Sequence, residues 1–195
     1  MHKFWLVLSL VALPCAAGAF THTEGVDGEL SADRLNPTSY VASLGANTLT
    51  GSVVSGDLDY FRITVPSGYE LVSLFLNSVT SSDDLAFIAV QQGTTFTVTP
   101  ATATASSLLG YAHFGTGGGA GGATPGNDML DDMGIAANAI GFVPPLTATD
   151  YTFWIQQTSA QSFGYSLNFV VVPEPGTAAL LLIGLVALAA ARRRS

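Results

Sequence analysis

Short stretches with the alternation of β-strands dominate the chain from Ser39 to Val171. In residues 59–65, Phe61, Ile63 and Val65 share one face, because successive side chains of a strand point to opposite sides. Further strand-like stretches cover residues 70–77, 85–92, 95–99, 151–157 and 163–171. Turn residues separate them, and no convincing amphipathic helix lies between them. The pattern predicts an all-β fold, an antiparallel, jelly-roll-like β-sandwich of roughly seven to nine strands.

The first 19 residues have the three parts of a secretory signal peptide. Lys3 gives a positive start, residues 4–13 are apolar, and Ala17-Gly18-Ala19 supplies the small residues of a cleavage site. Cleavage after Ala19 would also remove Cys15, the only cysteine. The exported domain would then have no disulfide and would depend on a packed core.

The C-terminal segment, residues 173–195, joins two prolines and a glutamate to an apolar run and a basic end. The run from Thr177 to Ala191 has 15 residues and no charge, and Pro173 and Pro175 stop a helix from extending backwards. As a helix the run would measure about 22 Å, against a hydrocarbon core of about 30 Å. Because positive flanks stay in the cytoplasm, we expect a short transmembrane helix that holds an exported precursor.

These ends divide the chain into a signal peptide (1–19), a polar leader (20–37), a β-sandwich domain (38–172) and a sorting or anchor segment (173–195). A glycine-rich stretch, residues 115–126, predicts a surface loop within the sandwich. Residues 20–172 hold thirteen of the fourteen acidic residues and two of the six basic ones, a net charge of −11. Such a charge repels phosphates, which excludes nucleic acid as a partner, and it permits divalent cations.

Two aspartate pairs are candidate ligands of a cation. Asp57 and Asp59 lie two residues apart, so their side chains share a face on a strand or converge in a turn. Asp83 and Asp84 lie in the next aspartate-rich turn. Their oxygens suit Ca²⁺, and no other cofactor is expected. Aspartate at a strand entry is also ordinary turn chemistry, and the spacing is not that of an EF-hand.

The exported part lacks the layout of a hydrolase. Its two histidines are His22, in the leader, and His113, beside the glycine-rich stretch. No serine lies in a G-x-S-x-G elbow, and a zinc site would need more His or Cys ligands. We therefore expect a protein that is not an enzyme, with a secreted hydrolase as the least favoured alternative.

Four aromatic residues suggest a second function, the binding of sugar rings: Tyr40, Tyr60, Tyr111 and Trp154. Aromatic residues are also frequent in strands, where they pack in the core and across strand pairs. Packing is the more ordinary role of these side chains, and carbohydrate binding stays open beside it.

The tail resembles the PEP-CTERM sorting signal of bacterial exported proteins. Three parts carry the resemblance: Pro173-Glu174-Pro175, the apolar run, and Arg192-Arg193-Arg194. It implies recognition by an exosortase, a membrane transpeptidase-like enzyme, with cleavage near Pro173-Glu174-Pro175. It also implies a Gram-negative host that makes exopolysaccharide, which is a candidate partner. The inner-membrane-anchored precursor would end at the cell surface or in the extracellular matrix.

A second resemblance covers residues 56–171. The stretch 56–66 has the G-D-x-D-x-F-x-[FIV]-x-V core of the bacterial pre-peptidase C-terminal domain, and Asp83-Asp84-Leu85 is similar to that family's aspartate-led strand. Residues 150–155 and 164–167 resemble its closing strand pair, while the glycine-rich stretch departs from its compact pattern. The resemblance implies a small β-sandwich, and some members of the family bind calcium. It implies little about function, because such domains serve varied proteins.

Together these features predict an exported, non-enzymatic protein of the cell surface or extracellular matrix, with a structural or adhesive role. The alternative is an extracellular module that binds carbohydrate or Ca²⁺.

Overall fold

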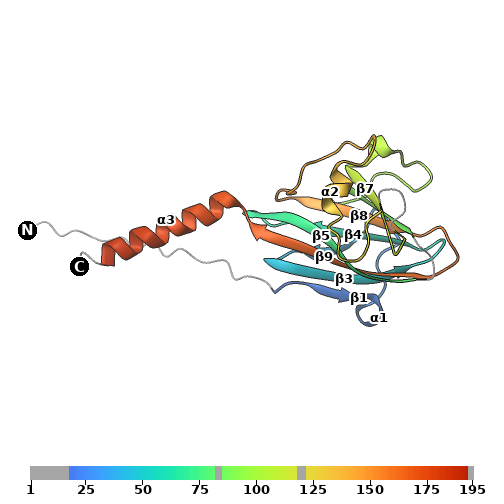
Figure 1. The fold of residues 1–195 in the computed structure, drawn as a ribbon, viewed down its shortest axis with the longest axis horizontal. Coiled ribbons are helices and arrows are strands. Elements are labelled where there is room, and N and C mark those ends of the chain that lie inside the picture. The colour runs from blue at the N-terminus through green and yellow to red at the C-terminus, as the bar shows by residue number, and fades with distance from the viewer. Residues whose placement is uncertain (1–17, 82–84, 118–121, 193–195) are drawn as a thin grey trace, which may run out of the picture.

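The computed structural model describes residues 18–81, 85–117 and 122–192 as two β-sheets, with helices in the connections and at the C-terminal end (Figure 1). Sheet A contains, in spatial order, β1 (Thr21–Thr23), β3 (Gly45–Val53), β9 (Phe163–Pro173) and β5 (Tyr69–Ser81). Sheet B contains β2 (Thr38–Val41), β4 (Leu58–Thr64), β8 (Asp150–Gln156), β6 (Ala86–Gln92) and β7 (Gly110–Phe114). The helices are α1 (Glu24–Asp27), η1 (Ala105–Ser107), α2 (Leu130–Gly134) and α3 (Pro175–Arg192). The nine strands of the described residues fit the predicted all-β class.

The core lies between the sheets and consists of the faces that the alternation predicts. On β9, Phe163, Tyr165, Leu167, Phe169 and Val171 are all buried while the residues between them are half-buried. From sheet B, Phe61 and Phe153 meet Phe169 of sheet A: the ring centroids of Phe61 and Phe153 lie 5.3 Å apart, as do those of Phe153 and Phe169. Ring pairs of this kind contribute about 0.5–1.5 kcal/mol each beyond their buried area, so the aromatic core fixes how the sheets face each other.

A second apolar layer covers the outer face of sheet B. Trp154 of β8 lies 2 % exposed among Tyr60, Phe96 and Leu108, and the last two come from the connection between β6 and β7. This layer explains why β8 is buried on both faces, whereas β9 is buried on one.

Both sheets are mixed, which corrects the prediction of a purely antiparallel sandwich. β1 pairs with β3 in parallel, and β2 pairs with β4 in parallel. The chain alternates between the sheets from β1 to β4, so each parallel pair is joined through a strand of the opposite sheet. A parallel pair requires such a crossover, because a hairpin returns the chain in the opposite direction.

Residues 20–37, the predicted polar leader, pack against the two sheets. His22 on β1 pairs with Leu49 of β3, and the side chain of Leu30 is 2 % exposed in the core. Phe20 stacks on Tyr40, with 4.6 Å between ring centroids. Of the predicted cleavage residues, Ala19 is exposed two residues before β1, while Ala17 lies outside the described residues, as does most of the predicted signal peptide.

β1 begins and β9 ends at the same end of sheet A (Figure 1). The carbonyl oxygen of Phe20 accepts a hydrogen bond of 3.0 Å from the N–H of Thr48. Gly45, which starts β3, pairs with Val171 near the end of β9. The chain therefore enters and leaves the sheets at one end.

α3 follows β9 and projects away from the sheets (Figure 1). Its described large apolar side chains are exposed: Leu180, Leu182, Ile183, Leu185, Val186 and Leu188. The predicted transmembrane helix is not found, because no helix of the described residues is long and apolar enough to cross a membrane. At 1.5 Å per residue, the 18 residues of α3 measure about 27 Å, and its first turn contains Pro175 and Gly176.

Candidate functional site

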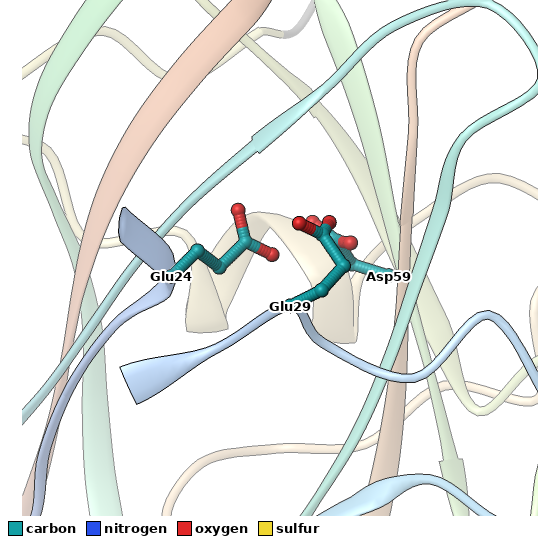
Figure 2. A group of neighbouring side chains, drawn as sticks. All are labelled: Glu24, Glu29 and Asp59. Carbon is teal, nitrogen blue, oxygen red and sulfur yellow. The ribbon is translucent and has the colours of Figure 1, made fainter. Parts of the chain in front are cut away.

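Three carboxylates from two parts of the chain, the segment 24–29 and β4, lie together (Figure 2). Glu24 is the first residue of α1, Glu29 follows that helix, and Asp59 is the second residue of β4. One oxygen from each side chain lies within 4.8 Å of the others. We call these three residues the carboxylate cluster. Asp59 is buried, Glu24 is half-buried and Glu29 is exposed, so the cluster is open to solvent on the side of Glu29.

Asp59 reaches into the space between the sheets. It lies two residues before Phe61 on β4, on the same inward face, and it is fully buried. The hydroxyl of Tyr165, on β9 of the opposite sheet, donates a 2.5 Å hydrogen bond to its Oδ2. Its Oδ1 is buried and has no hydrogen-bond partner among the described residues. One oxygen of this carboxyl group is thus positioned by the fold, and the other is left for a further partner.

Burial dominates the electrostatics of this pair. It raises the pKa of Asp59 to about 8, against the lowering effect of the Tyr165 hydrogen bond and with further raising by the charges of Glu24, Asp57 and Glu29. The pKa of the Tyr165 hydroxyl is also raised, first by burial and then by the Asp59 charge. Additional positive charge at this position would favour the ionised form of Asp59.

Backbone donors hold Glu24 in place. Its Oε2 accepts a 2.6 Å hydrogen bond from the N–H of Ser52 on β3, and its Oε1 accepts one of 3.3 Å from the N–H of Leu30. Burial nevertheless raises the pKa of Glu24. The neighbouring Gly51 keeps this space open, because a Cβ there would lie 2.6 Å from the Tyr165 hydroxyl oxygen and 3.0 Å from Cδ of Glu24.

Of the four aspartates that the sequence offered as Ca²⁺ ligands, the structure places one in the carboxylate cluster. Asp59 belongs to the carboxylate cluster, whereas Asp57 precedes β4 in a turn in which its N–H bonds to the carbonyl of Val54 at 2.9 Å. Asp83 and Asp84 lie outside the described residues. A Ca²⁺ site formed by all four aspartates stays a prediction.

Sequence reasoning missed Glu24 and Glu29, because they lie in the segment interpreted as a polar leader. They precede Asp59 by 35 and 30 positions, so no local spacing connects them. The signal that was present is the gathering of acidic residues in the predicted leader, which holds Glu24, Asp27, Glu29 and Asp33.

The candidate sugar-binding aromatics occupy different environments. Tyr60 and Trp154 are buried against each other, with 6.3 Å between ring centroids, and Tyr40 stacks on Phe20. Tyr111 lies half-exposed beside Phe87 and lines, with Trp154, a hollow of about 260 Å³ on the outer face of sheet B. His113 packs its ring edge-on to Phe87, 5.5 Å away between centroids.

The sorting segment is partly built into the fold. Pro173 is the last residue of β9 and pairs with Tyr69 of β5. The N–H of Glu174 donates a 2.9 Å hydrogen bond to the carbonyl of Gly68, Pro175 begins α3, and Arg192 ends it. Arg193 and Arg194 lie outside the described residues.

Comparisons with known proteins say little about the sandwich. No curated protein matches the chain. Among solved structures, the periplasmic inhibitor of g-type lysozyme PliG from Aeromonas hydrophila aligns with a TM-score of 0.33 and 14% identity, over 72% of this chain and 100% of that one. A similarity at that level supports no argument about fold or function. The resemblance to the pre-peptidase C-terminal domain is not confirmed.

Comparison with known protein families identifies a motif at the C-terminal end of the chain. Residues 171–195 match the PEP-CTERM protein-sorting motif, from the end of β9 through α3. This confirms the resemblance seen in the proline-framed glutamate, the apolar run and the arginines. The motif implies an exported protein with a membrane-anchored precursor. The chain is therefore an exported protein that carries a PEP-CTERM motif for sorting by an exosortase.

Proposed function

We propose that the sandwich is a non-enzymatic structural or adhesive component of the cell surface or extracellular matrix of a Gram-negative bacterium. The observation that carries the proposal is the sorting motif itself, which begins within β9. No linker separates the motif from the sandwich, so the sandwich is the cargo that the motif delivers. A domain with a net charge of −11 in residues 20–172 is also suited to a hydrated matrix, since like charges keep its copies apart.

Delivery is tested by the intact mass of the protein from its native host. We expect the signal peptide to be absent and the C-terminus to lie near Pro173-Glu174-Pro175. Replacing Glu174 with Ala should leave the full tail in place and keep the protein in the membrane fraction. A wild-type protein that retains Arg192 and the residues after it would contradict processing at the motif.

The structural or adhesive role is tested by deleting the gene in that host. We expect weaker attachment to surfaces or less retained exopolysaccharide, restored by the wild-type chain and not by the Glu174→Ala chain. Unchanged attachment and matrix would contradict the role. A hydrolytic activity of the purified protein that disappears with His113→Ala would instead favour the secreted-hydrolase alternative.

The second candidate is an extracellular binding module. The hollow beside Tyr111 favours a neutral glycan, because Phe87 and Tyr111 offer half-buried ring surfaces and Gln156 offers an amide at its wall. A glycan array would show binding that is lost in Tyr111→Ala, and an array with no signal would remove this candidate. The carboxylate cluster favours the other version, a module that binds Ca²⁺.

A further inference from the structure

We propose that Glu24, Glu29 and Asp59 bind one Ca²⁺ ion, which fastens the segment 24–29 to β4 of sheet B. The inference specifies the Ca²⁺-binding candidate function and assigns it a ligand set. It does not depend on the structural or adhesive role, and it concerns the end of sheet A that lies away from the sorting motif.

The spacing of the three carboxylates fits an ion of this size. Calcium–oxygen distances are about 2.3–2.6 Å, so two ligands on opposite sides of one ion lie about 5 Å apart. The oxygens of the carboxylate cluster all lie within 4.8 Å of one another. One ion placed among them could therefore contact all three side chains without a rearrangement of the backbone.

The buried oxygen of Asp59 provides independent support. Asp59 is 0 % exposed, and its Oδ1 has no hydrogen-bond partner among the described residues. An acceptor left unpaired in such a place costs about 1–3 kcal/mol, and more when the group is charged. Figure 2 shows the carboxyl groups of Asp59 and Glu29 side by side, with that of Glu24 facing them. A cation among the three would supply the missing partner.

Hydrogen bonds from neighbouring residues orient two of the three carboxylates of the cluster. The Tyr165 hydroxyl orients Asp59, and the N–H groups of Ser52 and Leu30 orient Glu24. Each carboxylate oxygen has two lone pairs, so an oxygen that accepts one hydrogen bond can still coordinate. The absence of a side chain at Gly51 leaves Glu24 and Tyr165 room to approach each other.

The donor set selects the metal. The cluster offers carboxylate oxygens alone, which suits Ca²⁺, while Zn²⁺ prefers nitrogen and sulfur ligands. Ca²⁺ takes six to eight oxygens in flexible geometry, and the exposed side at Glu29 lets water supply those that the protein does not. Mg²⁺ demands a near-ideal octahedron, which three carboxylate side chains alone do not enforce.

The alternative to a Ca²⁺ ion in the carboxylate cluster is a proton shared between Asp59 and a neighbouring carboxylate. A proton would also remove the unpaired charge, but it would give no response to calcium. The two occupants therefore predict different behaviour of the same protein in chelator and in calcium.

The test uses the full exported chain, stripped with EDTA and titrated with CaCl₂ at pH 7, while the melting temperature is followed. Tb³⁺, which shares the oxygen preference of Ca²⁺ and emits when nearby aromatic rings are excited, reports direct occupancy. We expect one saturable site per chain, a melting temperature that rises with Ca²⁺, and displacement of Tb³⁺ by Ca²⁺. Affinities of extracellular calcium modules lie at about 10⁻⁴–10⁻³ M, which sets the concentration range.

The exposed ligand gives the cleanest variant. Glu29→Gln should fold normally and weaken Ca²⁺ binding at least tenfold, whereas Glu70→Gln, the same change on β5, should leave the affinity within twofold. Asp59→Asn should show no calcium response and should melt below the calcium-loaded wild type.

Three results would overturn the proposal. One is a melting temperature that does not change up to 10 mM Ca²⁺. Another is an equal response to Mg²⁺ that persists in Glu29→Gln, which would indicate general charge screening. The third is an Asp59→Asn protein as stable as wild type in both chelator and calcium, which would assign the cluster to the proton. None of these results would affect the mass or location of the processed chain, so they are distinguishable from failure of the proposed function.

Discussion

Gly51 is the residue on which the geometry around Glu24 and Tyr165 depends. It pairs with Tyr165 in sheet A, and an added methyl group would lie 2.6 Å from the tyrosine hydroxyl oxygen. We expect Gly51→Ala to lower the free energy of unfolding by about 1–3 kcal/mol, the usual cost of forcing an extra methyl into a packed site. Denaturant unfolding measures the change. Gly25→Ala is the control, because a Cβ at Gly25 meets no atom within 4 Å, and a loss as large there would contradict the explanation.

The carboxyl group of Asp59 should make the stability of the metal-free protein depend on pH. Its pKa is about 8 in the folded chain against an ordinary 3.8, so the folded state holds this proton more tightly than the unfolded state. The stabilisation is complete below about pH 4 and is lost as the pH rises towards 8, with a slope of at most about 1.4 kcal/mol per pH unit from this group. Urea unfolding in EDTA across this range should show the decline. Asp59→Asn should make this decline in stability shallower, whereas Glu70→Gln should leave it unchanged. An equally steep decline in Asp59→Asn would show that other titrating groups cause it.

At the scale of single elements, three interior strands are those that the sequence predicts best. The alternation in residues 59–65, 151–157 and 163–171 corresponds to β4, β8 and β9, with the expected faces buried. These strands carry large apolar side chains at every second position, which is the physical cause of both the pattern and the burial.

Two edge strands, β1 and β2, escaped prediction for an equally physical reason, whereas the edge strand β5 contains the predicted stretch 70–77. β1 has three residues, Thr21–Thr23, and its place beside β3 depends on backbone hydrogen bonds that any sequence can make. The parallel direction of β1 and β2 follows from where the chain crosses between sheets, which side-chain alternation does not encode. The carboxylate cluster could be predicted only through Asp59, because its other members arrive with this unforeseen edge.

The attachment of the segment 20–37 can be tested through one buried side chain. Leu30 is 2 % exposed in the core, so Leu30→Ala should cost about 2–5 kcal/mol of unfolding free energy, as for other buried leucines. Val26, on α1 in the same segment, is 83 % exposed, and Val26→Ala should change stability by less than about 0.5 kcal/mol. Thermal unfolding of both variants makes the comparison. Similar small effects would mean that the segment does not fold with the sandwich.

At the scale of the whole molecule, α3 should add nothing to the stability of the sandwich. Its described large apolar side chains are between 55% and 71% exposed. A chain that ends at Glu174 should melt within about 2 °C of the full chain, equivalent to less than about 1 kcal/mol. A chain that ends at Asn168 loses the last part of β9, including buried Phe169 and Val171, and should not unfold cooperatively. Differential scanning calorimetry separates these outcomes, and a large loss on removing α3 alone would contradict the arrangement.

Because the chain enters and leaves the sheets at one end, one end of the sandwich lies near the tail and the other lies far from it. Phe20 and Val171 lie at one end of sheet A, while Gly51 and Ser52, which adjoin the carboxylate cluster, lie six to seven residues further along β3, about 20 Å away. In a precursor that is anchored through its tail, the carboxylate cluster therefore lies at the end of the sandwich opposite the anchor. The carboxylate cluster would meet external calcium while the protein is still attached, before any enzyme cuts the tail.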